Sequence, residues 1–245
     1  MQKKKIAISI TKDILKKIDE SVDGSIIRSR SQAIEFFLRK GFLENIDTAI
    51  IMLSKRHQKT ALTRFKKSTL IKEQIDFFRN NGIKNIFVLI QKNDNLSLIK
   101  KECEKFAEVF ITNSKKNGDA ILQMKNILKN DFIVMSGDIY NNFDINSMIK
   151  KHIVSKKIAT IGLMSRSTPS KYGTAILDGD FVINFQEKPK KPNSFIVNSG
   201  IYIFKTDVFE FMSGSIENDV LPKLARMKEL IGFFTTGEYV HFDEL

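Results

Sequence analysis

Three segments in the second half of the chain carry residues able to do chemistry, and the first is built around Asp138. This aspartate follows the apolar run 132–135 and the pair Ser136-Gly137. A carboxylate just past the end of a buried strand lies in the crevice where open α/β sheets bind ligands, and carboxylates suit Mg²⁺. A strand that ends in Gly-Asp can equally be an ordinary turn. On its own, the pair leaves both interpretations open.

The other two segments combine hydrogen-bonding side chains with glycine. Glu187 and Lys188 stand side by side and offer an acceptor for a hydroxyl group and a donor for a phosphate. The preceding Asp178-Gly179-Asp180 is typical of a hairpin turn. Further on, Asn198 supplies both a donor and an acceptor, and Gly200 would let the backbone approach a ligand closely.

Alternating strand and helix patterns indicate how these residues are positioned. Apolar strands are predicted at residues 49–53, 86–90, 109–112, 132–135, 159–163 and 199–204. Amphipathic helices are predicted at residues 70–80, 96–106, 120–129 and 145–154. Such alternation predicts an α/β domain over residues 48–245, Rossmann-like, with a mostly parallel mixed sheet.

In this order and spacing, the motifs resemble the sugar-phosphate nucleotidyltransferases, the family that makes nucleotide sugars. The resemblance implies that Asp138 is a Mg²⁺ ligand and that Lys188 meets a phosphate. It implies a pocket for a nucleotide sugar or sugar phosphate; the ligand-binding residues we predict for it are Gly118, Tyr172, Gly173, Glu187, Lys188, Asn198 and Gly200.

The chain departs from the family pattern in two places. Family members follow the first strand with a glycine-rich loop around the triphosphate, where glycine permits close backbone approach. Residues 54–67 contain no glycine. Lys59 is a candidate to replace the arginine of that loop, and Lys66 or Lys67 a candidate to replace its lysine. This basic segment is either a disordered loop or an added contact to DNA phosphates. The second metal carboxylate is predicted at Asp243, unless His241 has replaced it.

Residues 1–45 show a different pattern. Ile6, Ile8 and Ile10 alternate with polar or small residues, which predicts a half-buried strand. Two helices should follow, the first after Thr11 and the second after Ser29. So few residues cannot bury these side chains alone, but two chains could by pairing their strands.

This arrangement resembles the ribbon-helix-helix family of DNA-binding proteins. The resemblance implies a homodimer or higher oligomer that binds double-stranded DNA through its ribbon and the start of its second helix. The predicted DNA-binding residues are Lys3, Lys4, Lys5, Ala7, Ser9, Ser29, Arg30 and Ser31.

Composition sets broad limits. The net charge of +12 favours an anionic partner. No apolar run approaches the roughly 20 residues that cross a bilayer, so we expect no membrane partner. A single cysteine precludes an intramolecular disulfide, and we expect a cytoplasmic protein.

Three hypotheses follow for the whole chain. The leading one is a DNA-binding transcriptional regulator whose nucleotidyltransferase-like domain binds a nucleotide sugar or sugar phosphate as effector, without catalysis. The alternative is an active, Mg²⁺-dependent sugar-1-phosphate nucleotidyltransferase that carries a DNA-binding domain. The third is a structural fusion with neither ligand nor catalysis.

Overall fold

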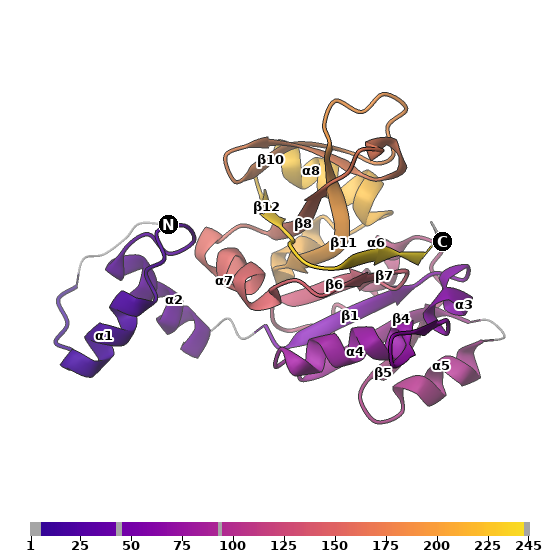
Figure 1. The fold of residues 1–245 in the computed structure, drawn as a ribbon, viewed down its shortest axis with the longest axis horizontal. Coiled ribbons are helices and arrows are strands. Elements are labelled where there is room, and N and C mark those ends of the chain that lie inside the picture. The colour runs from indigo at the N-terminus through magenta and orange to yellow at the C-terminus, as the bar shows by residue number, and fades with distance from the viewer. Residues whose placement is uncertain (1–5, 43–45, 93–94, 243–245) are drawn as a thin grey trace.

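A nine-stranded mixed sheet forms the centre of the molecule (Figure 1) in the computed structural model, which describes residues 6–42, 46–92 and 95–242. The strand order is β5-β4-β1-β6-β11-β8-β12-β10-β9. The strands are β1 (Thr48–Leu53), β4 (Asn85–Gln91), β5 (Glu108–Thr112), β6 (Phe132–Ser136), β8 (Ala159–Ser165), β9 (Thr174–Asp178), β10 (Phe181–Gln186), β11 (Ile196–Phe204) and β12 (Leu230–Phe234).

The sheet is parallel only in its first part. Strands β5, β4, β1 and β6 run parallel to one another, whereas β11 pairs antiparallel with both β6 and β8. Beyond β11, only β8 and β12 are parallel. The expected mixed sheet is confirmed, but "mostly parallel" describes only its first part. The direction changes at β11, and at the far edge β9 and β10 form an antiparallel hairpin, closed at Gly179 in the left-handed region with φ +59°.

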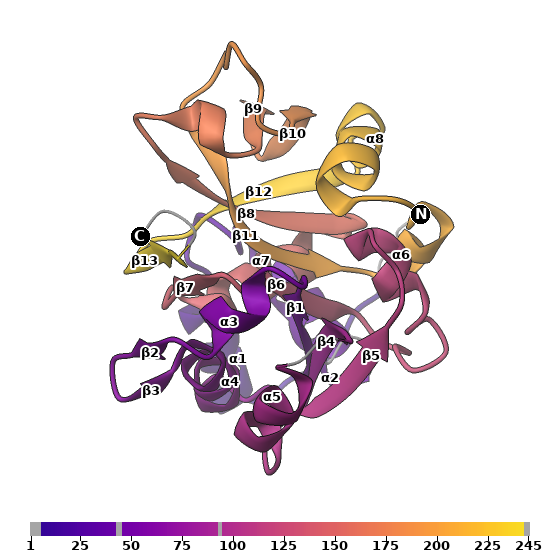
Figure 2. The same ribbon diagram turned by 90° about the vertical axis from the view of Figure 1, so that its right-hand side faces the viewer.

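Continuous apolar sequence explains the central strands. Every residue of β1 after Thr48 is buried, as expected for a strand covered on both faces. The covering helices are α4 (Leu70–Asn80), α5 (Leu96–Cys103), α6 (Asn117–Leu122), α7 (Ile145–Ser155) and α8 (Leu221–Arg226). Figure 2 shows α4 and α5 on one side of the sheet and α8 toward the β9–β10 hairpin.

The structure differs from the predicted elements at helix ends and in elements that were not predicted, among them α3 (His57–Ala61), α8 and β12. Asp144 caps α7 by accepting a hydrogen bond from the Ser147 backbone N–H at 3.0 Å. The helix predicted at 120–129 instead begins at Asn117 and ends at Leu122. Short elements complete the domain: α3, the hairpin β2 (Arg64–Phe65) and β3 (Ser68–Thr69), and the pair β7 (Ile139–Asn141) and β13 (Tyr239–His241). Three short helical turns belong to it as well: η1 (Pro169–Lys171), η2 (Thr206–Glu210) and η3 (Ile216–Val220).

The N-terminal segment contains the two predicted helices, α1 (Lys12–Glu20) and α2 (Arg30–Phe42), but not the predicted strand. Residues 6–10 form no regular structure, and Ile6 and Ile8 are 77% and 53% exposed. A strand needs a hydrogen-bonding partner, and the described part of this single chain supplies none there. The ribbon-helix-helix fold is therefore not shown.

The helices of this segment pack on the large domain rather than standing apart from it. Figure 1 shows them beside α7. Lys150 of α7 pairs with Asp23 at 2.5 Å, and Lys156 pairs with Glu35. Ile27 is fully buried and belongs to a hydrophobic cluster that continues into the large domain. Within the described residues, no helix is both long enough and apolar enough to span a bilayer.

Several of the predicted DNA-binding residues have other surroundings. Lys3, Lys4 and Lys5 lie outside the described residues, and Ala7 and Ser9 are exposed on irregular backbone. Arg30 forms a two-pronged ion pair with Asp19, with nitrogen–oxygen distances of 2.5 and 2.8 Å. This pairing neutralises the cation predicted to meet a DNA phosphate. Ser29 accepts a hydrogen bond from the Gln32 backbone N–H, and Ser31 lies in the first turn of α2.

Candidate active site

A large cavity of about 710 Å³ opens at the carboxyl ends of β1 and β6. Its lining comes from segments that are distant in the sequence: the ends of β1, β4 and β6, the approach to β9, the end of β10, and strands β11 and β13. Residues that line it include Ser54, His57, Gln91, Asp138, Tyr172, Gly173, Glu187, Lys188, Asn198, Gly200, Tyr202, Glu217 and His241.

The cavity brings together most of the predicted ligand-binding residues. Asp138 and six of the seven predicted ligand-binding residues line it, and Gly118 does not. A Cβ atom at Gly118 would lie 2.7 Å from the Gly214 carbonyl oxygen, so this glycine permits close packing of two backbones. Lys59 is exposed on α3 and also does not line the cavity. Asp243 lies outside the described residues.

One side of the cavity is a network of buried hydrogen bonds. Asn198 donates from Nδ2 to the Tyr202 hydroxyl at 2.6 Å, and that hydroxyl lies 3.1 Å from Glu217 Oε1. Asn117 and Ser215 also donate to the Glu217 carboxylate, at 2.8 and 2.9 Å. The network fixes the orientation of Asn198, whose own Oδ1 accepts from the Gly200 N–H.

Glu187 faces this network from the end of β10. Its Oε2 atom is buried and has no hydrogen-bond partner within the described residues. Burial, together with the negative charge of Glu217, raises the pKa of Glu187 to about 7. A Cβ atom at Gly173 would lie 2.6 Å from this oxygen, so glycine keeps the space beside it open. The arrangement can accept a hydrogen bond from a ligand hydroxyl.

The opposite side of the cavity is built around Asp138. Its Oδ2 atom lies 3.4 Å from His57 Nε2 and 3.3 Å from His241 Nε2. Burial by itself would raise the pKa of Asp138, but the hydrogen bond from His241 and the charges of both histidines outweigh it. The pKa of this carboxyl group therefore lies below its ordinary value.

A buried glutamine on α4 holds the loop that carries Asp138. Gln74 donates from Nε2 to the backbone oxygens of Ser136 and Ile139, at 2.9 and 2.6 Å. Gly137 belongs to this loop and packs against β1, where a Cβ atom would stand 2.8 Å from the Met52 carbonyl oxygen. The position of the Asp138 carboxylate thus depends on α4 and β1 as well as on its own strand.

These residues do not match the ligand set that Mg²⁺ prefers. A magnesium ion takes nearly octahedral oxygen ligands, usually carboxylates, phosphates and water. The two side chains in contact with the Asp138 carboxylate are imidazoles, one of them His241, which was considered as a replacement for the second carboxylate. The position predicted for that carboxylate, Asp243, lies outside the described residues. In the described ranges, no group of three or more His, Cys, Asp and Glu side chains is arranged to hold a metal ion.

The basic segment after β1 is not an extended loop. Residues His57–Ala61 form α3, and Gln58 is buried and donates to the Gln91 backbone oxygen at 2.6 Å. Lys55, Arg56 and His57 line the cavity. The absence of glycine therefore does not remove this segment from the site; side-chain cations occupy the place where a backbone loop was expected.

The sequence did not point to several residues of the site. Tyr202, Glu217 and His57 were not predicted. Tyr202 could have been found, because Asn198, Gly200 and Tyr202 alternate along one strand and period two places them on one face. Nothing in the local pattern around His57 announces its contact with Asp138, which is distant in the sequence.

Comparison with known proteins identifies relatives of the large domain. The chain is 36% identical over 110 residues to the mannose-1-phosphate guanylyltransferase catalytic subunit beta of Drosophila pseudoobscura, covering 43% of this chain and 30% of that protein. It is 27% identical over 165 residues to the bifunctional protein GlmU of Methanococcus aeolicus, covering 63% and 39%. The chain thus spans about a third of the length of these curated relatives.

Solved structures share the fold. A UDP-glucose pyrophosphorylase in complex with UDP-glucose superposes with a TM-score of 0.66 at 16% identity, over 80% of this chain and 93% of that one. HddC from Yersinia pseudotuberculosis gives the same TM-score at 21% identity, also over 80% and 93%.

These findings overturn the leading hypothesis from the sequence. The curated relatives include a protein named as a mannose-1-phosphate guanylyltransferase subunit, which conflicts with a DNA-binding transcriptional regulator without catalysis. That hypothesis depended on the glycine-free segment being unable to serve the site, and the structure places this segment on the cavity wall. The family model described as nucleotidyl transferase matches residues 48–230. The chain therefore belongs to that family.

Proposed function

We propose that the chain catalyses nucleotidyl transfer from a nucleoside triphosphate to a sugar 1-phosphate. In this reaction a phosphate oxygen of the sugar phosphate attacks the α-phosphorus of the triphosphate. The bond between the α-phosphorus and the bridging oxygen breaks, and pyrophosphate leaves. The products are a nucleotide sugar and pyrophosphate.

The observation that carries this proposal is the division of one cavity into two chemically different sides. Glu187, Asn198 and Tyr202 form a polar side with a buried, unpaired carboxylate oxygen, which suits the hydroxyl groups of a sugar. Lys55 and Arg56 line the same cavity and suit phosphate groups. Binding energy of this kind accelerates transfer by holding two reactants in one geometry.

Two residues are proposed to have separate roles. Lys188 borders the cavity immediately after Glu187, on backbone in the left-handed region with φ +44°. We assign Lys188 to the sugar phosphate and Glu187 to a sugar hydroxyl.

The test is product formation by the purified chain. Mannose 1-phosphate with GTP, and glucose 1-phosphate with UTP or dTTP, are incubated with the protein and excess MgCl₂. Nucleotide sugar and pyrophosphate are then quantified by anion-exchange chromatography and ³¹P NMR. We expect one pair to give both products in equal amounts, and Lys188→Ala to lower the rate at least tenfold. Lys190→Ala, an exposed neighbour outside the cavity lining, is the matched control. No product from any pair would contradict the proposal.

For the first part of the chain, we propose that residues 1–45 join two copies of the protein. Ile6, Ile8 and Ile10 alternate along the chain before α1 and are exposed by 77%, 53% and 37%, and Ile14 in the first turns of α1 is exposed by 47%. Apolar side chains with period two can pair with the same segment of a second copy, because a twofold interface is self-complementary. Residues 1–45 are thus proposed to act in assembly, and no nucleic acid is assigned to them.

A further inference from the structure

The Asp138 carboxylate is enclosed by side chains that leave little access for a metal ion. The exposed fractions of the Asp138, His57 and His241 side chains are 9%, 11% and 18%. Both imidazoles direct Nε2 toward the same carboxylate oxygen, at 3.4 and 3.3 Å. The Asp138 Oδ2 atom is thus already in contact with two nitrogen atoms, and an imidazole nitrogen is a ligand that a hard cation such as Mg²⁺ binds poorly.

Other cations line the cavity around this cluster. Six lysine and arginine residues contribute to the wall, against the three acidic residues Asp138, Glu187 and Glu217; the six are Lys55, Arg56, Lys115, Lys116, Lys171 and Lys188. They come from the segment after β1, from the segment before α6 and from the two ends of the β9–β10 hairpin. Positive groups therefore surround a bound anion on several sides.

A divalent cation in a phosphate site neutralises charge and fixes phosphate oxygens. Lysine and arginine side chains can also do both, because their hydrogen bonds to phosphate are charge-assisted. The six cations named above line the same cavity as Asp138 and can supply this charge from the protein itself.

We propose that the cavity binds the phosphate groups of a nucleotide sugar through its own cations and without a divalent metal. The inference rests on the proposed function, since it takes a nucleotide sugar as the ligand. In this arrangement Asp138 is a positioning residue that holds His57 and His241 and does not itself touch a metal.

The direction in which Asp138→Asn changes the affinity for nucleotide sugar distinguishes a site without metal from a metal-dependent site. Asp138→Asn keeps an oxygen that can accept hydrogen bonds from the imidazoles, but it removes a negative charge from a cavity that binds an anion. We expect this variant to bind nucleotide sugar as tightly as the original chain or up to about tenfold more tightly, since opposing charge is removed. In a metal-dependent site the same change would remove a ligand and weaken binding.

Isothermal titration calorimetry with GDP-mannose and with UDP-glucose, each in EDTA and in excess MgCl₂, gives the measurement. For the original chain, we expect the Kd in EDTA to equal the Kd in MgCl₂. For Asp138→Asn we likewise expect no difference between the two buffers. The inference would be overturned if MgCl₂ raised the affinity of the original chain more than tenfold and did not raise that of Asp138→Asn. Asp180→Asn is the control, because Asp180 lies outside this cavity and pairs with Lys151 at 2.7 Å.

Two further measurements keep the inference separate from the proposed function. Titration with Mn²⁺ alone, followed by the EPR signal of the free ion, should show no tight site that Asp138→Asn removes; such a site would overturn the inference. If neither nucleotide sugar binds in either buffer, the proposed function fails. Inorganic pyrophosphate in EDTA then decides the inference alone, with binding expected and absence of binding contradicting it.

Discussion

Glu187 is the residue whose ionisation is expected to couple most clearly to stability. Burial beside Glu217 raises the pKa of Glu187 from its ordinary value of 4.5 to about 7. The folded chain therefore binds a proton that the unfolded chain releases in this interval. The stabilisation that this proton on Glu187 gives to the folded chain is complete below pH 4.5 and is lost as the pH rises to about 7.

Replacing this carboxyl group by an amide should remove that pH dependence. We predict that the free energy of unfolding of the original chain falls, relative to Glu187→Gln, as the pH increases from 4.5 to 7. Urea unfolding at a series of pH values, followed by circular dichroism, measures the difference. Two parallel stability profiles across this interval would show that the carboxyl group is not perturbed. Glu210→Gln, at an exposed carboxyl group, is the control and should give a flat difference.

Gly137 tests the packing beneath Asp138. A methyl group there would lie 2.1 Å from Leu53 Cδ2 and 2.8 Å from the Met52 carbonyl oxygen. The leucine can adjust, but the backbone of β1 cannot move without disturbing the centre of the sheet. We expect Gly137→Ala to lower the free energy of unfolding by about 1–3 kcal/mol, the usual cost of overpacking. Chemical denaturation measures it. Gly41→Ala, with no atom within 4 Å of the added group, should cost nothing.

Among the elements, α4 has a role that its amphipathic pattern does not reveal. Gln74 is 1% exposed and supplies both hydrogen bonds to the loop between β6 and β7. Gln74→Leu would leave the carbonyl oxygens of Ser136 and Ile139 buried without these donors. Each buried group left unsatisfied costs about 1–3 kcal/mol. For the two carbonyl groups together we predict a loss of stability of about 2–6 kcal/mol. We also predict weaker nucleotide-sugar binding, because Asp138 lies within the loop.

Thermal unfolding and calorimetric titration of the same samples test both parts of this prediction. Asn80→Leu at the exposed end of α4 is the matched control, and it should leave both quantities unchanged. A stable Gln74→Leu variant with unaltered affinity would mean that the loop holds its position without α4.

The elements also show how far the sequence could predict the structure. Strand β1 and helix α4 were predicted within one residue, because continuous burial and helical periodicity are local signals. Helix α3 was missed, since its five residues carry no periodic pattern and Gln58 is held by β4, which is distant in the sequence. In the site, Asp138 follows a strand end and could be predicted. Its contacts with His57 and His241 could not, because they depend on how three separate segments meet.

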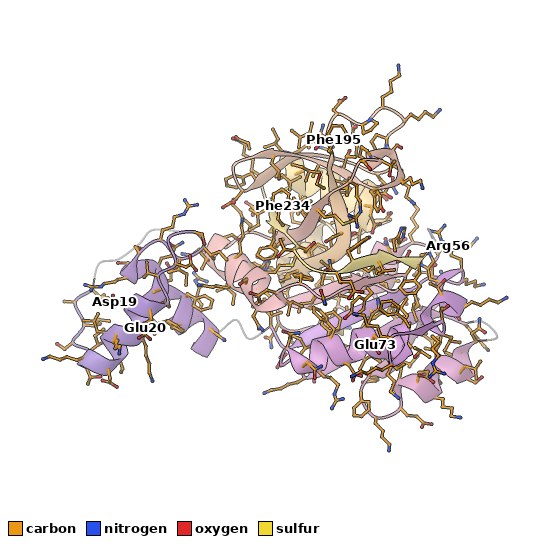
Figure 3. The ribbon with its side chains drawn as sticks, in the orientation of Figure 1. Asp19, Glu20, Arg56, Glu73, Phe195 and Phe234 are labelled. Atoms are coloured by element: carbon orange, nitrogen blue, oxygen red, sulfur yellow. The ribbon has the colours of Figure 1, made fainter. Side chains whose placement is uncertain are left out.

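At the scale of the whole molecule, the N-terminal helices and the cavity lie at opposite ends. Figure 3 shows Asp19 and Glu20 on one side of the molecule and Arg56 on the other. The helices are attached through α7, by the ion pairs of Lys150 and Lys156. Changes in the N-terminal segment should therefore leave ligand binding intact. This separation allows the assembly and the chemistry to be tested independently.

The exposed isoleucines before and within α1 allow the proposed dimer to be tested. If residues 6–14 join two copies, each isoleucine there is buried twice in a twofold dimer, once in each chain. Burying one such side chain contributes about 1.5–3 kcal/mol, so a single substitution removes roughly 3–6 kcal/mol from association. We predict that Ile8→Asp raises the dimer dissociation constant at least 100-fold in sedimentation equilibrium. The folded single chain should tolerate the change, because Ile8 is already exposed and lies outside every helix and strand. Thr11→Asp, a polar change at the end of the same segment, should leave the dimer largely intact. An original chain that sediments as a monomer would contradict the proposal directly.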